Sequence, residues 1–106
     1  MATYKKSIKK GELMAKLGNF VSVCNTESRN GYGTAPNQFE IRFENGSVFQ
    51  SYSSFIGARV CGQLYIGSYH DCSNTTSGHF GRWCGYNCKE RRKGLAEGKF
   101  IFVEED

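Results

Sequence analysis

The stretch QFEIRFENGSVFQSY, residues 38–52, decides how this chain is expected to fold. Phe39, Ile41 and Phe43 alternate with polar residues, which is the pattern of a β-strand with one apolar face. The Asn45-Gly46 dipeptide that follows favours a tight I′ turn. We therefore predict a β-hairpin that turns at Asn45-Gly46, with its apolar face toward the core. The expected pairs are Phe43 with Val48, Ile41 with Gln50 and Phe39 with Tyr52.

Further strand signals lie on both sides of this hairpin. NFVSVCN (19–25) indicates a strand, and the turn-rich ESRNGYGTAPN (27–37) that follows it is expected to be a surface loop. SFIGARVCGQLYIGSY (54–69) holds two β-rich runs around Cys61-Gly62, which indicates a second hairpin. KFIFVEE (99–105) is expected to close the chain as a strand.

Two or three short helices complete the prediction. One is expected around Lys9–Leu17, within a basic N-terminal segment. Ser73 is placed to cap a helix over 74–84, which Gly85 ends. Asn87 and Glu90 form an approximate capping box for another helix. The order of these elements predicts a single α+β domain over residues 1–106, with an antiparallel sheet that forms a meander of hairpins.

Composition and motifs narrow the class of protein. The 106 residues suit one domain, and no apolar run approaches the ~18–20 residues that span a bilayer. The N-terminus lacks the apolar stretch of a signal peptide, so a cytosolic protein is expected. No phosphate-binding glycine loop or paired-carboxylate site is visible, and His70 and His79 have no recognisable catalytic spacing. We expect a protein that is not an enzyme and has no small-molecule substrate.

The net charge of +4 comes mainly from two basic segments. They contain the residues that we expect to contact a partner: Lys5, Lys6, Lys9 and Lys10 in the first, and Arg91, Arg92 and Lys93 in the second. Such clusters suit phosphates or an acidic protein surface and argue against a protein that imitates DNA with carboxylates. The alternative is a solvated surface that only keeps the protein soluble.

Five cysteines in a cytosolic protein indicate metal binding or core packing rather than disulfides. Cys84 and Cys88 form a CxxxC pair where two predicted helices meet, and the second hairpin should bring Cys61 nearby. We predict a structural zinc (Zn²⁺) on these three thiolates. Cys24, His79 or water could complete the site, and Cys24 is favoured because structural zinc commonly has four Cys/His ligands. The alternative is that each cysteine is a small buried apolar residue.

Residues 39–104, roughly, resemble a family of small, uncharacterised proteins of bacteriophages and mobile elements. The shared features are an NG…FQSY hairpin, an LYI run, a SxTT helix start, an aromatic-Cys-Gly helix end where the family has aromatic-Leu-Gly, and a final G-x-[FY]-I-x-V strand. The resemblance implies a fold and no activity. It does not extend to the cysteines, so the zinc prediction depends on their spacing alone.

A small cysteine-rich chain without a catalytic signature is also similar to zinc-containing anti-CRISPR proteins that inhibit the Cas9 nuclease. This resemblance implies an inhibitor that acts in the cytoplasm of the bacterial host and binds Cas9 so that target DNA loading or cleavage is blocked. One alternative is a small phage nucleic-acid-binding module with a structural zinc, which would bind DNA or RNA directly and lose affinity steeply as salt rises. Another is a phage assembly protein, which would self-associate.

Overall fold

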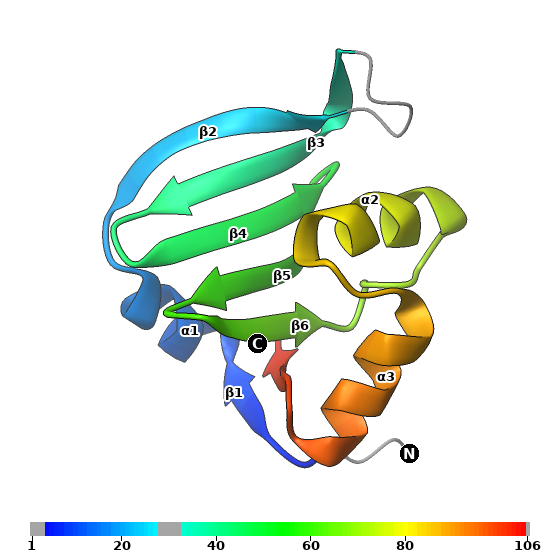
Figure 1. Ribbon diagram of the computed structural model, residues 1–106. Coiled ribbons are helices and arrows are strands. Elements are labelled where there is room, and N and C mark those ends of the chain that lie inside the picture. The colour runs from blue at the N-terminus through cyan, green and yellow to red at the C-terminus, as the bar shows by residue number, and fades with distance from the viewer. Residues whose placement is uncertain (1–3, 28–32, 106) are drawn as a thin grey trace.

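The computed structural model describes residues 4–27 and 33–105 (Figure 1). These residues form one α+β domain, as predicted, in which a seven-stranded sheet packs against three helices. In chain order the elements are β1 (Ser7–Lys9), α1 (Lys10–Leu17), β2 (Phe20–Glu27), β3 (Thr34–Phe43), β4 (Gly46–Ser51), β5 (Ser54–Val60), β6 (Gln63–Gly67), α2 (Asn74–Cys84), α3 (Cys88–Glu97) and β7 (Ile101–Glu104).

The strand order in the sheet is β1-β7-β6-β5-β4-β3-β2. The strands from β2 to β6 form the predicted antiparallel meander. In contrast, β7 pairs parallel with β6, and β1 pairs parallel with β7. The prediction of a wholly antiparallel sheet is therefore wrong at this edge. The reason is that α2 and α3 carry the chain back across the sheet before β7 begins, as a parallel connection requires.

The first predicted hairpin forms, but its turn lies at Glu44-Asn45, one residue earlier than predicted. The end of α1 holds this turn, because the Asn45 backbone N–H donates to the Leu17 carbonyl oxygen at 3.0 Å and the Asn45 side chain donates to the Lys16 carbonyl oxygen at 3.2 Å. The resulting pairs are Phe43 with Gly46, Ile41 with Val48 and Phe39 with Gln50, which corrects the predicted register.

Gly46 is a strand residue and not a turn residue. It is not among the residues with positive φ, so the I′ geometry predicted for Asn45-Gly46 is absent. A Cβ atom on Gly46 would lie 2.1 Å from the Arg59 carbonyl oxygen, so the close approach of β5 requires glycine here. The register shift moves each partner by two positions, and the predicted apolar face is kept because side chains alternate with a period of two.

The predictions for the second hairpin and for the helix ends are confirmed. β5 and β6 turn at Cys61-Gly62, whose φ angles of 50° and 82° are both positive, as an I′ turn needs. Ser73 caps α2 and Gly85 ends it in the left-handed conformation. Asn87 and Glu90 form the capping box of α3. The predicted N-terminal helix is α1.

The loop predicted at 27–37 is shorter in the structure. Glu27 ends β2, and Thr34–Asn37 belong to β3. Residues 28–32 of this predicted loop lie outside the described residues. In Figure 1, β2 and β3 form a long, bent pair at one edge of the sheet, away from α3.

The sheet buries apolar side chains on both of its faces. Leu13 and Leu17 of α1 pack on one face, where Ile41 and Phe43 of the first hairpin are partly buried at the margin. The strand residues of this core are Val48, Phe55, Ala58, Val60, Tyr65 and Val103. On the other face α2 and α3 supply Phe80, Cys84 and Leu95, which pack on Phe49, Ile56, Leu64, Ile66 and Phe100. The helices α2 and α3 thus lie together on one face, where the site described next is formed.

Candidate functional site

Arg91 lies at the centre of the junction between α3, α2 and the loop that follows β6, and its side chain is fully buried (0% exposed). Its Nε donates to His70 Nδ1 at 3.0 Å, and one Nη2 hydrogen bond reaches the His70 carbonyl oxygen at 3.1 Å. The guanidinium also donates to Ser77 Oγ at 2.8 Å and to the Tyr86 carbonyl oxygen at 2.6 Å. All four acceptors are neutral, so the buried charge has no carboxylate partner among the described residues.

His70 is held as a neutral imidazole. Burial is the largest cause that lowers the pKa of His70 from 6.5 to about 4. The charge of Asp71 opposes this shift, and the charges of Arg91 and Arg92 add to it. Because Nδ1 accepts the hydrogen bond from Arg91, we assign the proton of the neutral ring to Nε2. The ring therefore has an N–H donor left and no free acceptor.

Asp71 is held by two residues of α3. Its Oδ2 accepts hydrogen bonds from Arg92 Nη2 at 2.5 Å and from Cys88 Sγ at 3.7 Å. Burial acts to raise the pKa of the Asp71 carboxyl, but the hydrogen bond from Arg92 and the charge of Arg92 bring the pKa below its ordinary value. The carboxylate is thus ionised at neutral pH, and Asp71 and Arg92 neutralise one another.

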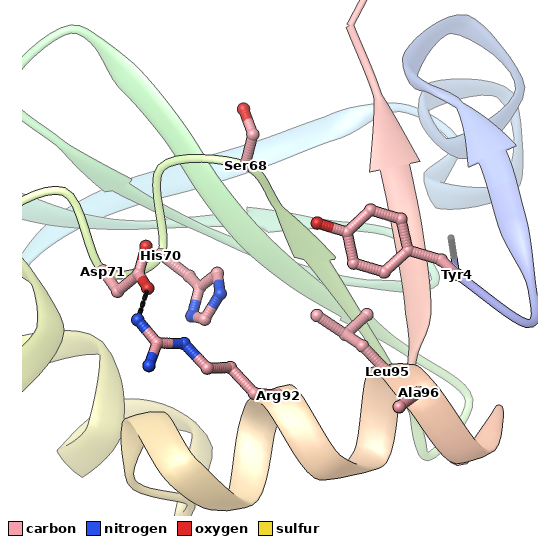
Figure 2. A pocket seen from close by; sticks show the side chains of 7 residues that line it. All are labelled: Tyr4, Ser68, His70, Asp71, Arg92, Leu95 and Ala96. Carbon is pink, nitrogen blue, oxygen red and sulfur yellow. Dashed lines mark hydrogen bonds and ion pairs between the residues drawn. The ribbon is translucent and has the colours of Figure 1, made fainter. Parts of the chain in front are cut away.

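A pocket of about 340 Å³ opens beside these side chains (Figure 2). Its lining consists of Tyr4, Ser68, His70, Asp71, Arg92, Leu95 and Ala96. Figure 2 shows the hydroxyl of Tyr4 pointing toward the side of the pocket that carries Ser68 and His70. The Tyr4 ring stacks on Phe102 of β7, with ring centres 4.0 Å apart. The N-terminal segment is thereby fixed as one wall of the pocket.

His70, Asp71 and Cys88 are the described residues that could together hold a metal ion, since their potential ligand atoms all lie within 4.8 Å of one another. Their hydrogen bonds oppose this. Arg91 occupies Nδ1 of His70, and Arg92 occupies Oδ2 of Asp71. Two guanidinium groups beside a single carboxylate also leave the group positive, which disfavours a divalent cation. The arrangement therefore fits a zinc ion poorly.

The four cysteines predicted as zinc ligands lie in different surroundings. Cys84 is buried in the core under α2, with its Sγ 3.5 Å from the Tyr86 carbonyl oxygen, and burial raises the pKa of its thiol. Cys61 is exposed at the turn between β5 and β6, and Cys24 is exposed on the edge strand β2. Cys88 is the one predicted ligand that belongs to the potential metal group. Zinc binding by these cysteines stays a prediction that the geometry does not support.

The seven basic residues predicted to contact a partner also lie in different parts of the structure. The prediction that Arg91 contacts a partner is corrected, because its guanidinium is fully buried and therefore not available to a partner. Arg92 and Lys93 are exposed on α3. Lys5 lies at the end of that helix, so close to Gly98 that a Cβ atom placed on this glycine would be 3.0 Å from Lys5 Cδ. Of the remaining residues, Lys6 precedes β1, Lys9 ends β1 and Lys10 begins α1. Lys10 pairs with Glu105 at 3.7 Å.

His70, Asp71 and Tyr4 line one pocket, and the sequence did not predict that these three residues meet. An adjacent His-Asp pair just before the Ser73 helix cap was the available signal for the first two. The position of Tyr4 depends on the parallel pairing of β1 with β7, which no local pattern predicts.

A protein-family model matches residues 8–100 of the chain, which include all three helices and most of the sheet. The chain belongs to this family of unknown function (DUF8033). No curated protein and no solved structure was found to match it. Among the described residues, no helix has the length and apolar character needed to cross a membrane. The similarity to bacteriophage and anti-CRISPR proteins, the absence of enzymatic activity and the cytoplasmic location stay predictions.

Proposed function

We propose that this chain is a non-enzymatic binding protein that docks on an acidic protein surface through a basic face centred on α3. The α3 basic face is defined by five exposed cations and the two carboxylates among them: Lys5, Lys89, Arg92, Lys93 and Lys99, with Glu90 and Glu97. Its excess of positive charge would steer an acidic partner and set its orientation.

The observation that carries this proposal is that the fold brings Lys5, from the N-terminal basic segment, to the end of α3, whose own basic residues lie near the other end of the sequence. β1 pairs parallel with β7, with Ser7 opposite Phe102, and Tyr4 stacks on the same Phe102. These contacts bring Lys5 to Gly98 at the end of α3. In Figure 1, β1 and β7 accordingly lie side by side next to α3. Lys5 therefore lies beside the exposed cations of α3, although more than 80 residues separate Lys5 from this helix in the sequence.

A protein partner is favoured over a nucleic acid. Glu90 and Glu97 lie among the cations of the α3 basic face, and they would repel a phosphate backbone. The exposed large aromatic side chains of the described residues are Phe20, Tyr52 and Tyr69, none of them on α3 or in the N-terminal segment. The face therefore lacks the stacking surface that binds unpaired bases.

Cas9 is the partner to test first, because the sequence analysis predicts a resemblance to anti-CRISPR proteins. The purified chain would be titrated against Cas9 loaded with guide RNA, with target DNA cleavage as a second measurement, and separately against free duplex DNA at low and at physiological salt. We expect binding to the nuclease, reduced cleavage and little affinity for free DNA. Salt-sensitive binding of free DNA together with unaffected Cas9 would instead support the nucleic-acid module.

Charge reversal tests the surface itself. Lys5→Glu combined with Lys93→Glu should weaken partner binding by about tenfold or more, because two favourable contacts become repulsive. Lys9→Glu combined with Lys16→Glu is the matched control, since it makes the same change of charge at exposed positions around α1. Equal losses in the two double variants would show that net charge matters and the α3 basic face does not.

A further inference from the structure

We propose that the pocket between Tyr4, the loop at 68–71 and α3 binds a small organic oxyanion, that is, a carboxylate or phosphate group carried on an apolar or aromatic body. The pocket shares Arg92 with the α3 basic face, but ligand binding there does not require the proposed docking of a protein partner. Three properties of the pocket support this ligand class: its charge, its hydrogen-bond donors and its apolar wall.

The charge near the pocket is positive. Asp71 and Arg92 neutralise one another in their ion pair. Arg91 is different, because it is fully buried directly behind His70 and has only neutral acceptors among the described residues. Solvent and salt screen a buried charge only weakly, so its field extends into the adjacent pocket. An anion bound there would supply the counter-charge that Arg91 lacks.

The polar wall of the pocket is rich in donors. His70 offers Nε2–H and no acceptor, because Arg91 occupies Nδ1. Tyr4 and Ser68 add hydroxyl groups, and Figure 2 shows the Tyr4 hydroxyl on the side of His70. Carboxylate and phosphate oxygens accept several hydrogen bonds at once, and such bonds are stronger when the acceptor is charged. The donors therefore match an oxyanion better than a neutral ligand.

The opposite wall is apolar. It consists of Leu95 and Ala96 of α3 and the ring of Tyr4, which stacking on Phe102 holds in place. The volume of about 340 Å³ lies at the lower end of the range for pockets that bind small organic molecules, about 300–1,000 Å³. A ligand with a small apolar body next to its anionic group would fill this space, whereas an inorganic anion alone would leave the apolar wall uncovered.

A metal ion is the competing occupant, and Asp71 distinguishes the two. Asp71 would be a ligand for a cation, since it belongs to the potential metal group with His70 and Cys88. Toward an anion its carboxylate is a repelling charge. Asp71→Asn should therefore tighten the binding of an oxyanion and weaken the binding of a metal.

The test is titration of the ¹⁵N-labelled full chain with benzoate, with phenyl phosphate and with benzamide, a neutral molecule shaped like benzoate. We expect both anions to shift the backbone amide signals of Ser68, His70 and Arg92 to saturation, and benzamide to bind at least about fivefold more weakly. Asp71→Asn should tighten benzoate binding by about threefold or more, and Arg92→Gln should weaken it by a similar factor. Lys93→Gln is the matched control, since the neighbouring residue loses the same charge outside the pocket.

Three outcomes would overturn the proposal. One is equal binding of benzamide and benzoate, and another is the absence of shifts at the pocket amides in the wild-type chain. The third is weaker benzoate binding by Asp71→Asn, combined with saturation of the wild-type chain by one equivalent of Zn²⁺. Thermal unfolding of each variant separates a loss of binding from a loss of folding.

Discussion

At the scale of single residues, Arg91 and Arg92 are neighbours with the same side chain and opposite roles. Arg91 is fully buried and donates four hydrogen bonds that tie α3 to α2, to the loop before α2 and to the loop after it. Arg92 is exposed and pairs with Asp71. Loss of a buried donor leaves its acceptors unsatisfied, whereas an exposed ion pair is replaced by water at little cost. Arg91 is therefore structural, and Arg92 is free to act in binding.

Arg91→Gln should lower the free energy of unfolding by about 3 kcal/mol or more, because buried acceptors lose their donors. Arg92→Gln, the control at the next position, should change it little because the side chain is exposed. Urea unfolding of both variants measures the difference. Equal losses would contradict the structural role assigned to Arg91.

Because His70 is buried as a neutral ring, we expect the free energy of unfolding to depend on pH. Its pKa is about 4 in the folded protein and 6.5 as the ordinary value, so the unfolded chain takes up the proton first as pH falls. The free energy of unfolding should be retained above pH 6.5 and decrease between pH 6.5 and 4, by about 2 kcal/mol once solvent screening is allowed for. Asp71, with its lowered pKa, keeps its charge through most of this range.

The measurement is urea unfolding at neutral pH and at about pH 5 and 4. His70→Gln is the matching variant, because glutamine has an amide oxygen that can accept a hydrogen bond but does not titrate in this range. Its stability should vary less with pH than that of the wild-type chain. A wild-type chain that is equally stable at pH 7 and pH 4 would show that His70 is not buried as a neutral ring.

At the scale of elements, the two hairpins contain the same kind of sequence signal with different physical causes. Cys61-Gly62 forms the I′ turn that a residue–glycine pair favours. At Asn45-Gly46 the glycine instead permits contact between β4 and β5, and the turn moves to Glu44-Asn45, where the end of α1 holds it. A turn dipeptide therefore locates a hairpin, but contacts from other elements choose its register.

Gly46→Ala should lower the free energy of unfolding by about 3 kcal/mol or more, since its Cβ atom would lie 2.1 Å from the Arg59 carbonyl oxygen and the strands would have to separate. Gly62→Ala meets no atom within 4 Å and should cost only about 1 kcal/mol, for its positive φ. Urea unfolding of the two variants compares these costs. A larger loss for Gly62→Ala would contradict the assigned role of Gly46.

At the scale of the whole molecule, helices cover both faces of the sheet at its centre and leave one edge open. β5 is the central strand, with packed side chains on both faces. β2 is an edge strand on which Val21 and Val23 are 60% and 53% exposed. Regions with few buried contacts open locally at low free energy, so stability should fall from β5 toward β2.

Native-state hydrogen exchange tests this gradient. The hydrogen-bonded amides of β5 should exchange most slowly, with opening free energies close to that of global unfolding, and the amides of β2 should exchange fastest among the strands. Protection of β2 equal to that of β5 would show that another chain, or a second copy of this one, covers the edge.

The sequence by itself determined the elements that depend on near neighbours in the chain. Ser73, Gly85 and Asn87 mark the helix ends correctly, because caps act on backbone groups within about four residues. Alternation of apolar residues likewise located the first hairpin and its apolar face, since side-chain direction in a strand follows from position alone. The α+β class follows from the order of these elements.

Only the tertiary structure decided what depends on residues distant in the chain. The parallel placement of β7 and β1 brings Tyr4 to the pocket, and packing under α2 turns Cys84 into a core residue and not an exposed ligand. Folding also buries the side chain of Arg91 and leaves that of Arg92 exposed, which gives the two neighbours different roles. No local pattern contains these results, because desolvation, hydrogen-bond partners and the counter-charge of a buried group are set by atoms that folding brings together.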